Sequence, residues 1–268
     1  MPRMFIETEK GEIMKNPLPR EIVPGIFWLG QCLEQHFQGN VYHAYNAAFL
    51  IVGSKSSLLV ETGHPGDFSE INRQVKEIAL PKKNKIEHLF ITHQETPHSG
   101  GLGRFLNEYS DLKTICGDTS DYHLAFPEHL KKLRHMEIGD SIDLGDRKFV
   151  IVEPVIRDMR TTLWGVDMKE RVLFPGDGFA YSHYHWDGHC GKTAEEAESL
   201  DLIDVSAVFA ERALFWTKYV DMNIYVDRLE EVIEEFKIQV IAPTHGLPIK
   251  NISQTLPKIR KGLVAAQA

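Results

Sequence analysis

Residues 92–101 read THQETPHSGG and follow a run of apolar residues, 86–92, whose pattern predicts a strand. His93, Glu95 and His98 therefore stand directly behind the end of a strand. Imidazole and carboxylate groups so closely spaced are typical of metal sites, although a polar loop that happens to be rich in histidine would look the same. The remaining strand ends of the chain help to decide between these interpretations.

Two more predicted strands end in a similar way. Residues 172–174 lead into FPGDG, which contains Asp177, and residues 239–242 lead into PTHG, which contains His245. In open α/β sheets, ligands bind beyond the carboxyl ends of the strands. We therefore expect Asp177 and His245 to lie beside His93 and its neighbours, and this joint pattern favours a metal site over a polar loop.

The residue types indicate which metals fit. Imidazoles combined with carboxylates suit iron, zinc or manganese. Asp177 has two carboxylate oxygens, so it can bridge two cations, which lie about 3.5–4 Å apart in two-metal sites.

The first half of the chain alternates predicted strands and helices. Residues 47–52 and 58–61 form two apolar runs separated by a turn, which predicts a hairpin. Asp67 with Glu70 resembles a capping box at the start of a helix. A second helix is expected over 102–109, followed by a strand at 114–117.

The second half continues this alternation. Strands are predicted at 148–155, 161–166 and 206–210, and a helix is predicted at 224–236. Strands alternating with helices indicate a layered α/β fold. No linker rich in glycine, serine or proline divides the chain, so we predict an N-terminal arm over residues 1–20 and one domain over 21–268.

Composition excludes several classes of protein. The formal net charge is −8, and no basic cluster of the kind that nucleic-acid binding requires is present. No apolar stretch approaches the roughly 20 residues of a membrane span, and the N-terminus does not resemble a signal peptide. Three cysteines without paired spacing, Cys32, Cys116 and Cys190, make a disulfide framework and a cysteine zinc site improbable and favour a cytoplasmic protein.

At this point the sequence resembles the metallo-β-lactamase superfamily, from about Asn40 to Ile252. The resemblance rests on four segments: LLVETG (58–63), THQETPHSGG (92–101), LFPGDGF (173–179) and IAPTHGLPI (241–249). The His-x-Glu order at His93 and Glu95 is similar to the flavodiiron and oxygen-binding diiron branch. The resemblance implies a four-layer αββα sandwich, a site with two irons, and a homodimer.

The chain departs from the pattern of that branch at two ligands. Pro97 stands where an aspartate is expected, and proline offers no ligand atom in its side chain. No histidine lies between His135 and His183, where the branch carries one, and Asp158 is a possible replacement of uncertain register. Five of the seven expected ligands remain: His93, Glu95, His98, Asp177 and His245. The resemblance implies that His93, Glu95 and Asp177 hold one metal and that His98, Asp177 and His245 hold a second.

The run His183 to Cys190 holds three histidines. His183 is predicted to contact substrate or to support the ligands, and with Asp158 it is a candidate catalytic base. His185 and His189 are left open. The aromatic residues nearby could line a substrate pocket or belong to the core: Phe179, Tyr181, Tyr184, Trp186, Phe215 and Trp216.

Three functions fit this pattern. The first is a non-haem diiron protein that binds or activates O₂ or another small substrate, with electrons from an external donor, since no flavodoxin-like segment follows His245. The second is a metal-dependent hydrolase that uses a metal-activated water, with zinc or manganese as alternative metals. The third is a partner subunit with a degenerate pocket, which the two missing ligands favour.

Overall fold

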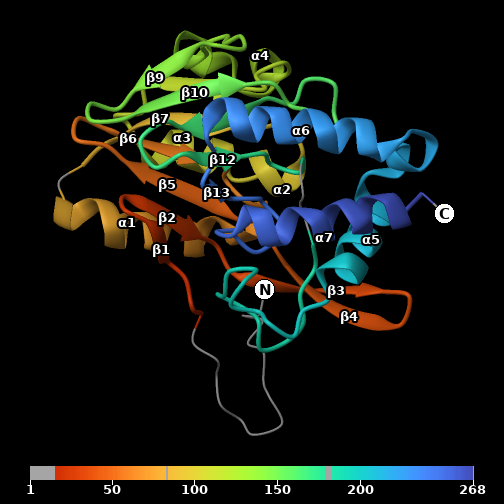
Figure 1. The fold of residues 1–268 in the computed structure, drawn as a ribbon. Helices are drawn as coiled ribbons and strands as arrows, with labels where there is room; N and C mark the ends of the chain where they lie inside the picture. Colours follow the sequence, from red (N-terminus) through yellow and green to blue (C-terminus); the bar gives the residue numbers. More distant parts are fainter. Residues whose placement is uncertain (1–15, 83, 179–182, 268) are drawn as a thin grey trace, which may run out of the picture.

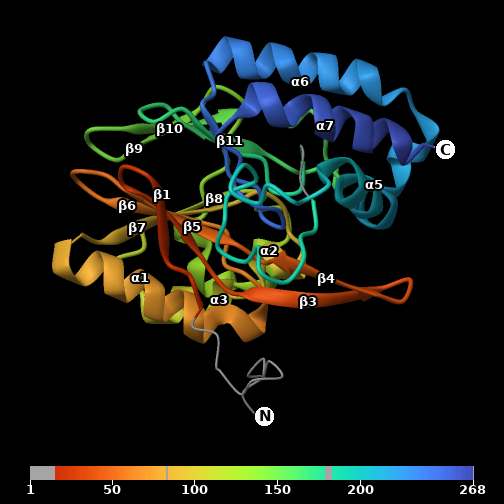
Figure 2. The same ribbon diagram turned by 60° about the horizontal axis from the view of Figure 1, so that its bottom comes forward.

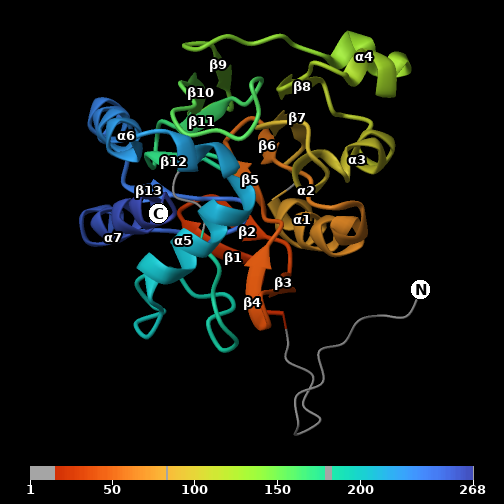
Figure 3. The ribbon, with the colours of Figure 1, turned by 90° about the vertical axis from the view of Figure 1, so that its right-hand side faces the viewer.

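The computed structural model describes residues 16–82, 84–178 and 183–267, and these residues form two β-sheets packed face to face between layers of helices (Figures 1 and 3). Figure 3 shows the layers from the side. The helices on one side are α1 (Phe68–Lys82) and α3 (Leu102–Glu108), and those on the other side are α6 (Met222–Phe236) and α7 (Ile252–Ala265). This arrangement confirms the expected αββα order of layers.

The first sheet has six strands in the order β1-β2-β5-β6-β7-β8. Their bounds are Arg20–Val23, Ile26–Leu29, Ala48–Val52, Ser57–Val60, Ile86–Ile91 and Thr114–Gly117. β5 and β6 form the predicted hairpin, in which Phe49 lies opposite Val60. β6, β7 and β8 run parallel, and the chain returns between them through α1 and then α3. The carboxyl end of β7 therefore lies at the edge of the sheet where residues 92–101 begin.

The second sheet has five strands in the order β13-β12-β11-β10-β9. Their bounds are Val240–Ile241, Val172–Phe174, Trp164–Asp167, Lys148–Val152 and Ser141–Asp143. β12 and β13 are parallel, with Leu173 opposite Ile241. Their carboxyl ends consequently meet at one edge, which brings the turn after β12 next to the loop after β13.

The main core lies between the two sheets. Side chains of a strand alternate between its faces, so Phe49 points into this core while Leu50 joins a second cluster beneath α1 and α3. The rings of Phe49 and Phe174 lie 5.4 Å apart, and those of Phe90 and Phe149 lie 5.0 Å apart. These contacts join the sheets and fix the relative position of the strand ends that carry the predicted ligands.

The strand predicted at 206–210 is wrong, because these residues lie in helix α5 (Leu202–Ala213). The carboxylate of Asp201 accepts hydrogen bonds from the backbone N–H groups of Ile203 and Asp204 and caps this helix. One face of α5 joins the main core, where α7 packs against it. In a short apolar run the polar residues that would reveal a helical or a strand-like spacing are missing, so the pattern does not distinguish a helix from a strand.

The start of the first helix also differs from the prediction. A 3-10 turn, η1 (Pro65–Asp67), precedes α1, and its cap is His64. The Nδ1 atom of His64 accepts a hydrogen bond from the Gly66 N–H, and the Asp67 carboxylate accepts one from the His64 N–H. The capping box therefore lies three residues earlier than predicted, and Glu70 instead binds Arg73.

Shorter elements complete the fold. A two-stranded ribbon, β3 (Cys32–Phe37) with β4 (Asn40–Tyr45), projects beside the segment that follows residue 183 (cyan in Figure 2). The other elements are α2 (Thr96–Ser99), α4 (Tyr122–Ala125), η2 (Pro127–Lys132) and η3 (Phe215–Tyr219). None of the helices in the described part of the chain is long and apolar enough to cross a membrane.

Only the last residues of the predicted N-terminal arm lie within the described ranges. The Asn16 side chain donates hydrogen bonds to the carbonyl of Gly30 and to Glu70. Leu18 is buried in the main core, and Arg20 already belongs to β1. The end of the arm therefore packs as part of the domain, and residues 1–15 lie outside the described residues.

Candidate metal centre

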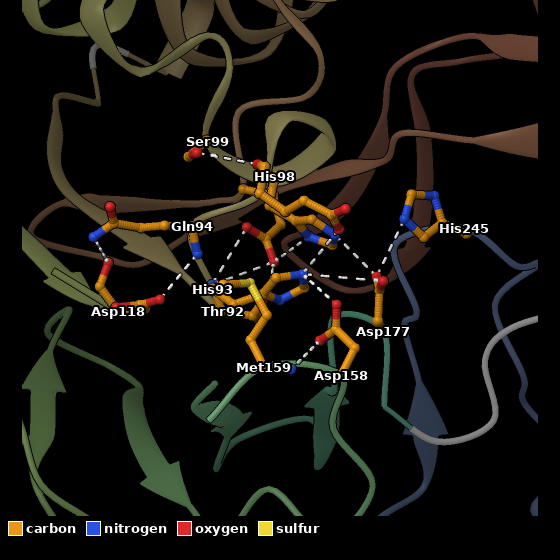
Figure 4. Close-up of polar contacts among 12 residues, drawn as sticks. Thr92, His93, Gln94, His98, Ser99, Asp118, Asp158, Met159, Asp177 and His245 are labelled. Atoms are coloured by element: carbon orange, nitrogen blue, oxygen red, sulfur yellow. Dashed lines mark hydrogen bonds and ion pairs between the residues drawn. The ribbon is translucent and has the colours of Figure 1, made fainter. Parts of the chain in front are cut away.

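The predicted ligands come together at the edge where β7, β12 and β13 end (Figure 4). Glu95 and His98 lie at the start of α2, immediately after His93. Asp177 lies in the turn after β12, and His245 follows β13. We call these five residues, together with Asp158, the Asp177 cluster. The cluster is assembled from loops, but each loop is fixed by a strand of the packed sheets.

Asp177 lies at the middle of this cluster. Its Oδ1 atom is 2.9 Å from His98 Nε2 and 3.1 Å from His245 Nε2. Its Oδ2 atom faces the other side, 4.0 Å from His93 Nε2. The two carboxylate oxygens therefore face two different groups of side chains, as a carboxylate that bridges two cations must do.

Three carboxylates surround one imidazole nitrogen. His93 Nε2 lies 3.5 Å from Asp158 Oδ2, 3.6 Å from Glu95 Oε2 and 4.0 Å from Asp177 Oδ2. These separations are too long for hydrogen bonds, and this buried nitrogen has no hydrogen-bond partner among the described residues. A metal ion about 2.0–2.2 Å from each donor would satisfy the nitrogen and the oxygens together.

The opposite ring nitrogens of two histidines are held by groups that only accept hydrogen bonds. Nδ1 of His98 lies 3.3 Å from Glu61 Oε1, and Nδ1 of His245 lies 2.6 Å from the carbonyl oxygen of Tyr45. Each Nδ1 must therefore carry the proton, so in the neutral ring the lone pair of Nε2 points at Asp177. Partners of this kind fix the tautomer and the orientation of metal-binding histidines.

Thr92 has the same effect on the third histidine. Its hydroxyl donates to Glu61, so its oxygen is left to accept from His93 Nδ1, 3.1 Å away. The Nε2 lone pair of His93 is thereby directed at the three carboxylates. Glu61 supports both histidines, because this buried carboxylate contacts both Thr92 and His98.

The charges of the cluster favour a cation. Burial and then the negative charge of Asp177 raise the pKa of Asp158. Burial opposes ionisation of Asp177 as well, but the charges of His245 and His98 prevail and hold its pKa well below the usual range. A bound cation would relieve the repulsion between the two carboxylates, because such an ion is the largest local charge in a site of this kind. The donor set therefore fits one or two metal ions.

The two departures from the expected ligand set have different consequences. Pro97 lies in the first turn of α2 and offers no donor atom. Asp158, whose register the sequence left uncertain, places its carboxylate 3.5 Å from His93 Nε2. One side of the cluster therefore has His93 with three carboxylates, and the other side has three protein groups, His98, Asp177 and His245.

His183 is held away from this arrangement. It is buried, and its Nε2 atom accepts a hydrogen bond from the backbone N–H of Leu247 at 3.1 Å. Burial, followed by the charge of His185, lowers the pKa of His183 to about 3, so its ring is neutral. His183 thus supports the loop that carries His245, which agrees with a supporting role better than with a catalytic one.

The predicted aromatic wall is formed only in part. Tyr184 is buried and contacts Phe209, whose ring stacks on His245 at 5.8 Å. Phe209 was missed because its segment was predicted to be a strand. Phe179 and Tyr181 lie outside the described residues.

A surface cleft reaches the cluster at Asp158. Its volume is about 660 Å³, and Met159, Trp216 and Tyr225 line it together with Asp158. Trp216 donates a hydrogen bond from its indole N–H to the carbonyl of Arg157. Trp216 is therefore part of a cleft wall, as one of the two interpretations predicted, whereas Phe215 is 67% exposed.

Comparisons with known proteins place the chain in one family and among one group of relatives. The model of the ODP family beta lactamase matches residues 45–246. A nitric oxide reductase of Moorella thermoacetica is 23% identical over 240 residues, which is 85% of this chain and 57% of that protein. A coenzyme F420H(2) oxidase of Methanothermobacter marburgensis is 23% identical over 241 residues, with the same two coverages. The chain therefore spans less than two thirds of the length of these relatives.

Solved structures show the same fold. The rubredoxin oxygen:oxidoreductase of Desulfovibrio gigas superposes with a TM-score of 0.69 at 18% identity, over 91% of this chain and 60% of that one. The flavodiiron protein of Giardia intestinalis gives a TM-score of 0.72 at 14% identity, over 91% and 59%. A 254-residue fragment of a diflavin flavoprotein from Nostoc is covered to 95%, with a TM-score of 0.65 at 14% identity.

Proposed function

The chain belongs to the ODP family of beta lactamases, and from this premise we propose that it is a non-haem diiron protein that binds or reduces a small oxidant, O₂ or NO. The proposal rests above all on the contact geometry of His93, whose unpartnered Nε2 atom faces three carboxylates. The names of the relatives, a nitric oxide reductase and an F420H(2) oxidase, support a reaction with such oxidants.

The donor set supports iron rather than zinc. His93, Glu95, Asp158 and Asp177 would hold the first ion, and His98, His245 and Asp177 would hold the second. Carboxylates are hard ligands that favour iron or manganese, and the replacement of an imidazole by Asp158 strengthens this preference at the first position. When bound, iron supplies electrons to the oxidant and positions at which a small molecule can coordinate.

The protein's own residues position the ligands and admit the substrate. Glu61, Thr92 and the Tyr45 carbonyl hold the three imidazoles with Nε2 inward, and burial of His93 and His98 excludes water from that side. The Glu95 side chain is 51% exposed, so a small molecule has a route to the cluster beside it. The electrons would come from a separate donor protein or flavin.

The other two functions are left without a specific observation in their favour. A hydrolase needs a free base near the metal, and of the two candidates His183 is engaged with Leu247 while Asp158 faces His93 as a ligand would. A degenerate pocket that binds no metal would not need a hydrogen bond at each Nδ1 atom to turn the Nε2 atoms of its histidines inward. The homodimer implied by the resemblance remains a prediction that light scattering can test.

Metal analysis of protein purified without added metal tests the proposal. We expect close to two irons per chain in the wild type and fewer than one in Asp177→Asn, with Asp111→Asn as a control at an exposed ion pair with Lys85. After anaerobic reduction and removal of the reductant, iron-loaded protein should consume O₂ or NO, with a change in absorption. Zinc that is lost in Asp177→Asn, together with ester hydrolysis in the absence of a reductant, would instead support the hydrolase, and the absence of any metal that depends on Asp177 would support a degenerate pocket.

A further inference from the structure

A second group of possible metal ligands lies outside the Asp177 cluster. It consists of Cys32, His43, His185 and Cys190, and one donor atom of each lies within 4.8 Å of all the others. We call it the Cys₂His₂ cluster. The sequence made a cysteine zinc site improbable because no CxxC pair is present, but the structure brings these four side chains together from segments that are far apart in the chain.

The ribbon β3–β4 supplies two of the four side chains. Cys32 lies opposite Tyr45, and His43 lies opposite Glu34. Because alternate residues of a strand share one face, Cys32, Tyr45 and His43 point to the same side of the ribbon, with Cys32 and His43 as diagonal neighbours. Cys32 Sγ lies 3.3 Å from His43 Nδ1.

The segment after residue 183 supplies the other two. His185 forms an antiparallel bridge with His43, in which each backbone N–H donates to the carbonyl of the other residue. The chain then turns at Gly188, which has a φ of +82°, and returns Cys190 to the ribbon. The next residue, Gly191, donates its N–H to the Tyr45 hydroxyl at 2.8 Å. Backbone hydrogen bonds therefore fix His185 and Cys190 against the ribbon.

The separations of the donor atoms suit a tetrahedral ion. Zn–S bonds of about 2.3 Å and Zn–N bonds of about 2.0–2.1 Å place the donors of a tetrahedral site roughly 3.3–3.8 Å apart. Cys32 Sγ lies 3.3 Å from His185 Nε2, and Cys190 Sγ lies 3.4 Å from His43 Nδ1. The two sulfurs are 3.0 Å apart, somewhat closer than in that geometry but well beyond the length of a disulfide bond of about 2.05 Å.

Hydrogen bonding alone does not account for this arrangement. Cys32 Sγ faces His43 Nδ1, His185 Nε2 and Cys190 Sγ. A thiol can donate its one proton to only one of these three neighbours, and towards the other two its sulfur is only a weak acceptor. His43 and His185 are buried, at 5% and 0% exposure. Two sulfurs and two buried imidazoles that converge on one point have the composition of a structural zinc site.

We propose that Cys32, His43, His185 and Cys190 bind one zinc ion in a closed, structural site separate from the Asp177 cluster. With four protein ligands, this ion has no open position for a substrate. It would fasten the ribbon β3–β4 to the segment that follows residue 183.

The zinc site would also support the first centre. Tyr45 lies two residues after His43, its ring stacks on His185 at 5.4 Å, and its carbonyl oxygen holds Nδ1 of His245. His183, which accepts the hydrogen bond from Leu247, lies two residues before His185. Zinc binding would therefore hold in place two of the groups that position the loop of His245.

Zinc content in single variants tests this site. We expect one zinc per chain in the wild type and in Asp177→Asn, and less than about one tenth of that in Cys32→Ser and Cys190→Ser. Cys116→Ser is the matched control, since Cys116 is buried elsewhere with its thiol directed to the Leu89 carbonyl. Co²⁺-substituted protein should show a thiolate-to-metal charge-transfer band in the near ultraviolet that Cys116→Ser retains. Zinc that persists in both cysteine variants would overturn the proposal.

A second measurement does not depend on the folding of the cysteine variants. In Asp177→Asn protein kept under reductant, Cys32 and Cys190 should resist alkylation until a zinc chelator is added, although both are partly exposed. Alkylation before the chelator, or a mass lower by two hydrogens that reveals a Cys32–Cys190 disulfide, would contradict the proposal. These measurements follow zinc and thiols, so they can succeed or fail independently of iron at the Asp177 cluster.

Discussion

The Nε2 atom of His93 lies 3.5 Å from the carboxylate of Asp158, the residue that we propose as the replacement for the expected histidine. The proposed first metal position would therefore have one imidazole and three carboxylates. Three anionic ligands stabilise a higher charge on the metal than two do. Without a metal ion, the three carboxylates would also repel one another more strongly than two would. This relationship leads to the first prediction.

Replacing Asp158 tests its assignment as a ligand. In Asp158→Ala we expect a loss of about one iron per chain, because His93 and Glu95 would then share the ion only with Asp177. Asp158→His should keep both irons, because it restores an imidazole at this position. Elemental analysis after gel filtration gives the stoichiometry. Two irons retained in Asp158→Ala would show that Asp158 is not a ligand.

Pro97 leaves the second position short of a carboxylate. We expect Pro97→Asp to hold the second iron more tightly, by roughly tenfold, a change in affinity of the size reported for groups that support metal ligands. The measurement is the rate of iron loss to a chelator, which should show a slower second phase in the variant. Pro97→Ala is the control, since it removes the proline ring without adding a ligand. If the two variants lose iron equally fast, position 97 does not face the metal.

Glu61 should act through His98 without touching the metal. Its carboxylate accepts the hydrogen bond from His98 Nδ1, so Glu61→Gln weakens this acceptor and with it the basicity of Nε2. We expect metal affinity to fall about 10- to 100-fold, as for other supporting groups of metal-binding histidines. Competitive titration against a chelator measures this change, with Glu87→Gln as a control at an ion pair with Lys113. An unchanged affinity would contradict this role.

The lowered pKa of His183 should make the free energy of unfolding depend on pH. Its pKa is lowered to about 3 in the folded protein, mainly by burial, while an unfolded chain has a pKa near 6.5. The unfolded state therefore binds the proton first, and stability from this residue is present above pH 6.5 and is lost as the pH falls towards 3.

Between pH 7 and pH 5 the loss from His183 amounts to about 2 kcal/mol of unfolding free energy. In His183→Gln the side-chain oxygen can still accept the hydrogen bond from the Leu247 N–H. Between pH 7 and pH 5 the free energy of unfolding of this variant should therefore fall by about 2 kcal/mol less than that of the wild type. Urea denaturation at the two pH values measures the difference. Equal losses in both proteins would show that His183 is accessible to protons in the folded state.

The sequence by itself determined the type of fold and most of the first site. Two apolar runs separated by a turn predicted the hairpin of β5 and β6, and strands followed by His93, Asp177 and His245 predicted a shared edge, which the parallel pairing of β12 with β13 creates. These features depend on short-range periodicity and on the general geometry of α/β sheets, so they can be read without knowing how distant segments meet.

Only the tertiary structure decided the remaining features. The largely apolar run 206–210 became a helix because α7 packs against α5 in the core, a contact that no local pattern records. Asp158 lies beside His93 because the segment that follows β10, a strand of the second sheet, reaches the end of β7 in the first sheet. Cys32 and Cys190, which are far apart in sequence, meet only because the bridge between His43 and His185 fixes both segments. The residue types could be read in advance, but their convergence depends on long-range packing, which sequence spacing does not encode.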